Sequence, residues 1–242
     1  MTHSPGEPLY RTESFALPGA PGGDVCFNLR MPVNAAGRSL PVLIVLAGIK
    51  TGHQTLERLP APGDNAVLAY AYPYDRERWR RSSIFRRALV AYRMSRDVCG
   101  QIDVLLRWVK AQSWADPQRV HIVGGSLGAI LLPMILRHLQ ARGGSVRTAV
   151  MAYGGAGRMT LAYLSLRHRS RLLGAAAGLL VGLFLRHMEP ARHLPHLRCE
   201  FLVVSSPDDS LVPRRCAQRL ETLLPEPKTI IHMRGEHVDA SN

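Results

Sequence analysis

The chain has 242 residues, of which 46% are hydrophobic and 20% are charged, and its formal net charge is +13 at pH 7. This length is ordinary for one α/β domain with a sizeable core. Only three of the 31 basic residues are lysine, arginines are spread along the chain and aromatic residues are sparse, which argues against a nucleic-acid-binding protein. A basic surface can still attract anionic substrates, phospholipid or acidic partners.

Two short segments near the N-terminus, 15–18 and 24–31, are separated by a run of Gly, Ala and Pro. This spacing predicts an antiparallel strand pair. Six longer apolar runs follow and alternate with helical patterns, which predicts an α/β fold with a mostly parallel central sheet flanked by helices. The six predicted central strands are 41–48, 66–73, 119–124, 147–154, 199–205 and 228–233.

One helix is predicted ahead of the third central strand. Ser95 suits the N-cap position, because its side chain can accept a hydrogen bond from an N–H of the first turn. The apolar residues that follow recur at helical spacing and would form one buried stripe. They are Val98, Ile102, Leu105, Leu106 and Val109.

The most informative stretch is Gly-Gly-Ser-Leu-Gly at 124–128, which follows one apolar run and opens another. The pattern predicts a strand, a sharp turn and a helix, with glycines that let strand and helix approach closely. Ser126 would then stand exposed at the helix N-terminus, as a nucleophile of acyl transfer does. The alternative is a glycine-rich turn that binds a phosphate, although the usual nucleotide-binding motifs are absent from the sequence.

Two later strands lead into residues that could complete a catalytic triad. The fifth central strand runs into Ser-Pro-Asp-Asp-Ser-Leu-Val-Pro, which contains Asp208 and Asp209. The last predicted strand runs into Gly-Glu-His, which ends at His237. On an α/β sheet with this kind of serine turn, the chain order is serine, then acid, then histidine. The sequence therefore predicts that His237 and one of the two aspartates meet Ser126.

These motifs resemble those of the α/β-hydrolases, nearest to the small dienelactone-hydrolase and prolyl-oligopeptidase-like esterases. The resemblance rests on Asp-Pro-Gln-Arg-Val before the Gly-x-Ser-x-Gly motif, on Asp209-x-x-Val-Pro and on Gly-x-His237, and it spans about 41–237. It implies one α/β-hydrolase domain over 1–242. In that family the aspartate of Asp-x-x-Val-Pro is the acid, which implies Asp209, with Asp208 as the adjacent alternative.

The resemblance also implies an oxyanion hole made of two backbone N–H groups. One is the N–H of Leu127, directly after the serine, and the other follows the first central strand, at Ile49. Many relatives carry His-Gly at this strand end, whereas this chain has Ala47-Gly48. Gly48 still allows the backbone to approach a substrate closely.

The segment at about 157–196 is too long and too varied for one crossover helix, so we expect a helical cap inserted between two core strands. It contains an apolar run at 172–185, which as a helix would be ~21 Å long and too short for the ~30 Å core of a bilayer. Three interpretations stay open. The run is a packed cap helix, part of a lid that contacts a membrane surface through 167–187, or a homodimer contact through its evenly spaced glycines.

The four cysteines are far apart and form no Cys-x-x-Cys pair, so we expect neither a metal site nor a redox pair. Residues 1–14 are polar and lack an apolar signal segment, so we expect a cytoplasmic protein. The preference for arginine over lysine is typical of a GC-rich bacterial genome. Only five residues follow His237, so we expect one face of the sheet to be less covered than in the resembled family.

The combined prediction is a cofactor-independent serine hydrolase that cleaves a small-molecule or lipid ester through an acyl-enzyme on Ser126. A thioesterase, a lysophospholipase or an acyltransferase at a membrane surface uses the same chemistry and is the runner-up. A noncatalytic interaction protein on a hydrolase scaffold is the alternative from another class.

Overall fold

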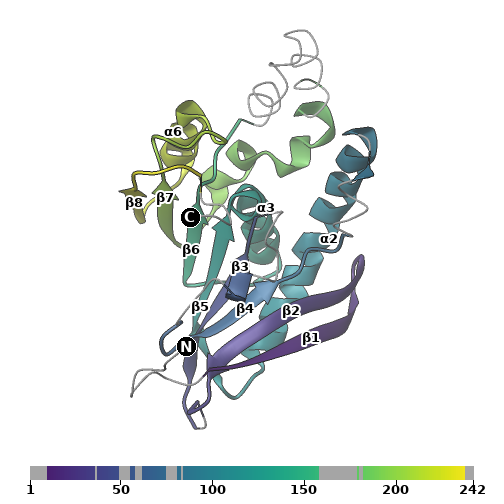
Figure 1. The fold of residues 1–242 in the computed structure, drawn as a ribbon, viewed down its shortest axis with the longest axis vertical. Helices are drawn as coiled ribbons and strands as arrows, with labels where there is room; N and C mark the ends of the chain where they lie inside the picture. The colour runs from purple at the N-terminus through teal and green to yellow at the C-terminus, as the bar shows by residue number, and fades with distance from the viewer. Residues whose placement is uncertain are drawn as a thin grey trace.

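The computed structural model describes residues 10–35, 37–48, 55–57, 62–74, 81–82, 84–157, 179 and 182–237 (Figure 1). Within these ranges, eight strands form one sheet in the order β1-β2-β4-β3-β5-β6-β7-β8. They are β1 (Tyr10–Ala20), β2 (Gly23–Pro32), β3 (Leu40–Leu46), β4 (Ala66–Tyr70), β5 (Ala115–Gly125), β6 (Thr148–Ala152), β7 (Glu200–Ser205) and β8 (Lys228–His232). Every predicted strand is confirmed, although the ends differ by several residues.

The pairing of the strands brings the candidate residues to one edge of the sheet. β1 pairs antiparallel with β2, and β2 pairs antiparallel with β4, so the predicted N-terminal pair is confirmed. From β4 through β3, β5, β6 and β7 to β8, every neighbouring pair is parallel. The carboxyl ends of parallel strands lie at the same edge, where α/β folds bind their ligands. Ser126, Asp209 and His237 all follow such ends.

Strands β3 and β4, inside the sheet, are buried on both faces, and β3 shows how. Val42 and Ile44 belong to the larger apolar core, whereas Val45 lies in a second cluster with Leu56, against which Leu43 packs. Successive side chains of a strand point to opposite faces, so a strand with two buried faces must be apolar throughout. This requirement explains the continuous apolar runs in the sequence.

Helices cover the larger core. The α-helices with described bounds are α2 (Ile84–Lys110), α3 (Leu127–Ala141) and α6 (Arg214–Leu223). Helices α2 and α3 contact each other, and Ile102 of α2 and Leu131 of α3 are both fully buried in this core (Figure 1). The stripe predicted for α2 is confirmed, because each of its five residues is at most 2% exposed.

The predicted N-cap at Ser95 is wrong, because α2 begins eleven residues earlier, at Ile84. Ser95 is fully buried in the middle of the helix. Its Oγ donates a hydrogen bond to the carbonyl of Tyr92 at 2.7 Å and also contacts Nε2 of His187 at 2.7 Å. A serine can satisfy its hydroxyl on the preceding turn, and this removes the need for a helix start at this position.

The described end of the predicted cap lies between β6 and β7. It holds Leu179, residues 182–196 and within them the 3-10 helices η2 (Arg186–Met188), η3 (Pro190–Arg192) and η4 (Leu194–His196). Most of the apolar run at 172–185 lies outside the described residues, so the extent of the cap stays a prediction. Among the helices that the structure describes, none combines the length and the apolar character needed to cross a membrane.

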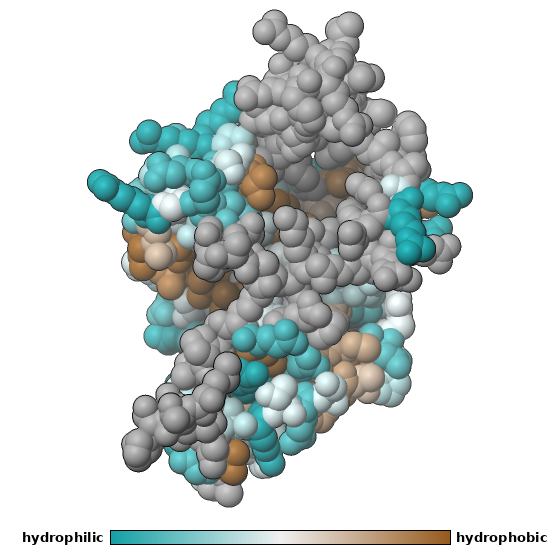
Figure 2. Space-filling view, in the orientation of Figure 1, coloured by the Kyte–Doolittle hydropathy of each residue, from teal (hydrophilic) through white to brown (hydrophobic). Residues whose placement is uncertain are grey.

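Strand β8 forms one edge of the sheet and carries apolar side chains that are partly exposed. Ile230 is 37% exposed, Ile231 44%, and Met233, just beyond the strand, 50%. In Figure 2 an apolar area is visible on the left of this face, where Figure 1 places β8. Within the described residues, the four residues of β8 after Lys228 are therefore all exposed, and the predicted lower coverage relative to the resembled family stays a prediction.

The approach of α3 to β3 supplies a test of the fold. A Cβ atom at position 128 would overlap the carbonyl oxygen of Leu46, whereas one at position 125 would meet nothing within 4 Å. We expect Gly128→Ala to lower the free energy of unfolding by about 2 kcal/mol or more, because overpacking forces helix and strand apart. Gly125→Ala should change it by less than about 1 kcal/mol. Urea unfolding of both variants measures this, and equal effects would contradict the close approach.

Candidate active site

Ser126 occupies the sharp turn between β5 and α3. Its backbone has φ 52° and ψ −107°, a conformation that residues other than glycine rarely adopt. A Cβ on Gly124 would lie 2.7 Å from the backbone of Gly128, so both glycines are needed for the turn to close. The strand, turn and helix predicted around the serine are therefore confirmed.

Hydrogen bonds on both sides hold this turn. The N–H of Ser126 donates to the carbonyl of Ala152 at the end of β6, at 2.9 Å. The carbonyl of Ser126 accepts the N–H of Ile130 at 3.2 Å, which starts the hydrogen-bond ladder of α3. Because the backbone is fixed in two directions, the strained conformation persists and the side chain stands at the carboxyl edge of the sheet.

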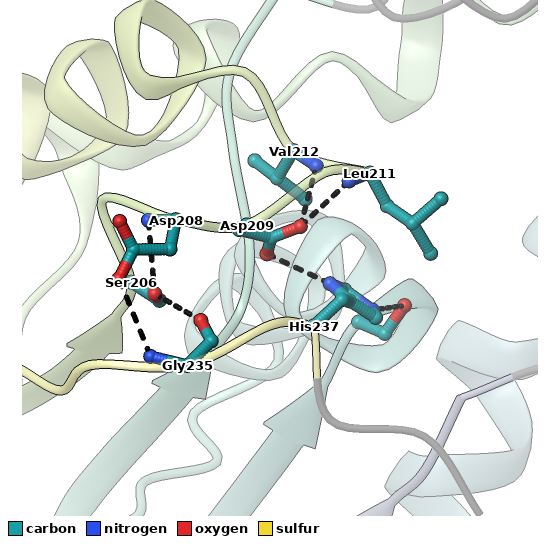
Figure 3. Close-up of polar contacts among 8 residues, drawn as sticks. Ser206, Asp208, Asp209, Leu211, Val212, Gly235 and His237 are labelled. Atoms are coloured by element: carbon teal, nitrogen blue, oxygen red, sulfur yellow. Dashed lines mark hydrogen bonds and ion pairs between the residues drawn. The ribbon is translucent and has the colours of Figure 1, made fainter.

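Three side chains from distant parts of the chain meet at this edge (Figure 3). Nε2 of His237 lies 2.9 Å from Oγ of Ser126, and Nδ1 of the same ring lies 2.7 Å from Oδ2 of Asp209. The His237 side chain is 7% exposed and that of Asp209 is 2% exposed. The structure thus brings together the three residues that the sequence selected.

The two adjacent aspartates have different surroundings, and this separates the two candidate acids. Oδ1 of Asp209 accepts the N–H groups of Leu211 at 2.8 Å and Val212 at 2.9 Å, so Oδ2 is aimed at His237. The carboxylate of Asp208 turns away and accepts the N–H of Gly235 at 3.5 Å. Of the two, Asp209 is the aspartate in contact with the imidazole.

Hydrogen-bond capacity assigns the proton positions. A carboxylate only accepts, so Nδ1 of His237 must carry the proton that Asp209 receives. In a neutral ring Nε2 is then the acceptor, and the Ser126 hydroxyl donates to it. The ring is in the tautomer that can take a proton from the serine, and the carboxylate would stabilise the cation that results.

The predicted oxyanion hole falls partly within the described chain. Leu127 is the first residue of α3, where N–H groups have no acceptor inside the helix. Ile49 lies outside the described residues. The end of β3 just before it is fixed, because the hydroxyl of Tyr72 donates to the carbonyl of Ala47 at 2.9 Å. Burial raises the pKa of Tyr72 well above its ordinary value, so this hydroxyl keeps its proton.

Two residues beside the triad were not found from the sequence. Tyr153 has φ 54°. Among the described residues other than glycine, Tyr153 and Ser126 are the two with a positive φ. Its ring centroid lies 5.5 Å from that of His237, and the planes meet at 70°. Ser206 is 4% exposed and bonds to both turns that carry the acid and the histidine. The Tyr-Gly-Gly sequence directly after a predicted strand was a usable signal for Tyr153, whereas no local signal pointed to Ser206.

Neither a protein-family model nor a curated protein matches this sequence. Solved structures do resemble the chain. An acetyl xylan esterase from Paenibacillus sp. R4 is 16% identical, with 99% of this chain and 82% of that chain covered and a TM-score of 0.70. Carboxyl esterase 2 from Tuber melanosporum is 18% identical, with 96% and 80% covered and a TM-score of 0.64.

A puromycin-hydrolyzing peptidase from Mycobacterium tuberculosis has a TM-score of 0.67 at 19% identity, and the match covers 95% of this chain but 36% of that one. These likenesses, with the mixed eight-stranded sheet and its flanking helices, decide the fold class. The chain has the α/β-hydrolase fold. At such low identity the likeness concerns the fold alone and does not assign an activity.

The strain at Ser126 supplies a test of the turn. We expect Ser126→Gly to be more stable than Ser126→Ala by about 1 kcal/mol, because only glycine adopts this positive φ without a steric cost. At Ser210, an exposed serine without a positive φ, the same two substitutions should show no advantage for glycine. Thermal unfolding of the four variants compares them. A Ser126→Ala variant as stable as Ser126→Gly would mean that the turn is unstrained.

Proposed function

We propose that this chain is a cofactor-independent serine hydrolase that cleaves carboxylic esters through an acyl-enzyme on Ser126. One observation carries the proposal: the imidazole of His237 lies between the Ser126 hydroxyl, at 2.9 Å, and the Asp209 carboxylate, at 2.7 Å. A serine hydroxyl is a weak nucleophile at neutral pH and needs a base within hydrogen-bond distance. The carboxylate orients that base and stabilises its charged form.

The reaction proceeds in two acyl transfers. Oγ of Ser126 attacks the ester carbonyl carbon while Nε2 of His237 takes its proton. The tetrahedral intermediate collapses, the bond to the alcohol oxygen breaks and the imidazolium returns the proton to the alcohol. Water then attacks the acyl-enzyme with the same base, and the acid and Ser126 are released. Asp209 keeps its negative charge throughout.

Negative charge on the carbonyl oxygen needs donors that are already in place. The N–H of Leu127, at the N-terminus of α3, is directed by the serine turn and is reinforced by the positive end of the helix dipole. The proposed second donor is the N–H of Ile49. Loss of one such donor costs about 3 kcal/mol of transition-state stabilisation in comparable enzymes.

Substitution of the nucleophile tests the proposal. We expect Ser126→Ala to lower kcat for p-nitrophenyl acetate by about 10³-fold or more while the fold is kept, because the proposed acyl bond forms on Oγ of Ser126. A fluorophosphonate probe should label the wild type at Ser126, as read by mass spectrometry of the peptide, and should not label the variant. Ser210→Ala is the matched control and should label as the wild type does.

Activity of Ser126→Ala equal to that of the wild type would contradict the assignment. A folded wild type that neither hydrolyses esters nor reacts with the probe would favour a noncatalytic protein on a hydrolase scaffold. Replacement of the ester by a matched thioester, and addition of an acceptor alcohol, separate an esterase from a thioesterase and from an acyltransferase.

A second candidate is an esterase that works at an anionic lipid surface, such as a lysophospholipase. It is favoured by Leu179, Leu183 and Phe184, which are 53%, 65% and 44% exposed, and by exposed Arg186. Phe184 packs on Tyr92 with ring centroids 4.9 Å apart. Large apolar side chains beside arginine are the combination that binds an interface with negative headgroups.

Vesicle binding tests this second candidate. We expect the wild type to sediment with vesicles that contain phosphatidylserine and to hydrolyse long-chain esters faster in their presence. Leu183→Ser should weaken binding several-fold, because it removes apolar area from the contact. Val33→Ser is the matched control, since Val33 is 56% exposed and follows β2, which lies between β1 and β4 and is separated in the sheet from β6 and β7, the strands on either side of Leu183 in the chain. Equal binding by the two variants, or no binding by the wild type, would exclude the lipid-surface role.

A further inference from the structure

The two turns that carry the acid and the base are held in unequal ways. Asp209 closes its own turn, since its Oδ1 accepts two N–H groups from the next three residues. The turn at 234–237 has no such internal bond among those the structure describes. Its described hydrogen bonds all come from the segment around the end of β7, apart from the one between His237 and Ser126, and the ring of Tyr153 packs against that of His237.

Ser206 lies at the centre of these anchors (Figure 3). Its buried Oγ donates a hydrogen bond to the carbonyl of Gly235 and accepts the N–H of Asp208 at 3.1 Å. The carboxylate of Asp208 accepts the N–H of Gly235 at 3.5 Å. Both polar backbone groups of Gly235 are thus bonded to the acid loop, two residues before His237.

We propose that Ser206 and Asp208 act as positioning residues, a clamp on Gly235 that holds His237 within reach of Ser126. This proposal rests on the hydrolase function proposed above. Neither residue contacts the reacting atoms, so the clamp acts only through the location of the imidazole. Gly235 has φ 125°, a conformation that residues with a side chain rarely adopt. As a glycine it has no side chain that would restrict the backbone at this point. Hydrogen bonds from outside are therefore what define its conformation.

Position matters because a general base works only at hydrogen-bond distance from its proton. A displacement of about 1 Å at a catalytic group can reduce a rate about 10²-fold. Substrate binding does not depend on the imidazole to the same degree. Loss of the clamp should therefore lower kcat and leave KM nearly unchanged. A purely structural role for Ser206 would instead lower the folded fraction and leave the folded enzyme fully active.

Steady-state kinetics with p-nitrophenyl acetate tests the clamp. We expect Ser206→Ala to lower kcat by about 10- to 100-fold with KM within about twofold of wild type, since only positioning is lost. Ser210→Ala, on the same loop and exposed, should leave both constants unchanged. At Asp208 the asparagine variant keeps an oxygen that can accept the N–H of Gly235, whereas alanine does not. We expect D208N to retain more activity than D208A.

A second readout does not depend on turnover. The proton on Nδ1 of His237, hydrogen-bonded to Asp209, should give a downfield proton NMR signal in the wild type and in Ser126→Ala, and Asp209→Asn assigns it by its loss. We expect the signal to weaken or broaden in Ser206→Ala, because the ring is released from the carboxylate. Thermal unfolding shows which variants are folded, and if Ser206→Ala does not fold, the D208N and D208A pair carries the test.

The outcomes separate the two proposals. A folded Ser206→Ala with wild-type kcat and an unchanged Nδ1 signal would overturn the clamp, as would equal activities of D208N and D208A at the wild-type level. A wild type without esterase activity, whose Nδ1 signal is still lost in Ser206→Ala, would support the clamp and reject the proposed hydrolase function.

Discussion

The site depends on one close approach, between the first turn of α3 and the backbone of β3. Helix and strand come so near that position 128 has no room for a Cβ, and the chain can enter the helix only through a positive φ at Ser126. That conformation directs the serine hydroxyl away from the sheet and leaves the N–H groups of the first helical turn facing the same space. The proposed nucleophile and one proposed donor for the developing charge thus follow from one packing contact.

The parallel sheet supplies the rest of the arrangement. Strands β5, β7 and β8 run in the same direction, so the residues after them meet at one edge although 111 positions separate Ser126 from His237. Ser126 and His237 are thus far apart in the sequence but lie at hydrogen-bond distance in the structure. Strands β5 and β7 pair with a neighbour on each side, so the loops after them start from fixed points, whereas β8 lies at the edge and is largely exposed.

Much of this could be predicted from the sequence, because the decisive signals are local. Continuous apolar runs indicate a sheet with two buried faces, and glycines on either side of Ser126 indicate a turn that only small residues allow. Ser95 shows where local signals fail. The hydroxyl of Ser95 could form its hydrogen bond either at a helix N-cap or with the preceding helical turn. Which of the two occurs depends on a contact with His187, a residue far along the chain. Ser206 was missed for the same reason, since its partner Gly235 lies 29 residues along the chain.

The difference between Asp209 and His237 is consistent with the tasks that we propose for them. In the proposed mechanism Asp209 only has to hold a charge in place, and a carboxylate locked by two N–H groups of its own turn does so without outside help. His237 would exchange a proton with Ser126 and then with a leaving group at a slightly different position, so its ring would need a small range of movement. A turn held through hydrogen bonds at Gly235 allows that range more readily than a turn packed into the core. Under the two proposals, the geometry of the acid loop sets both the charge beside the imidazole and the limits within which the imidazole moves.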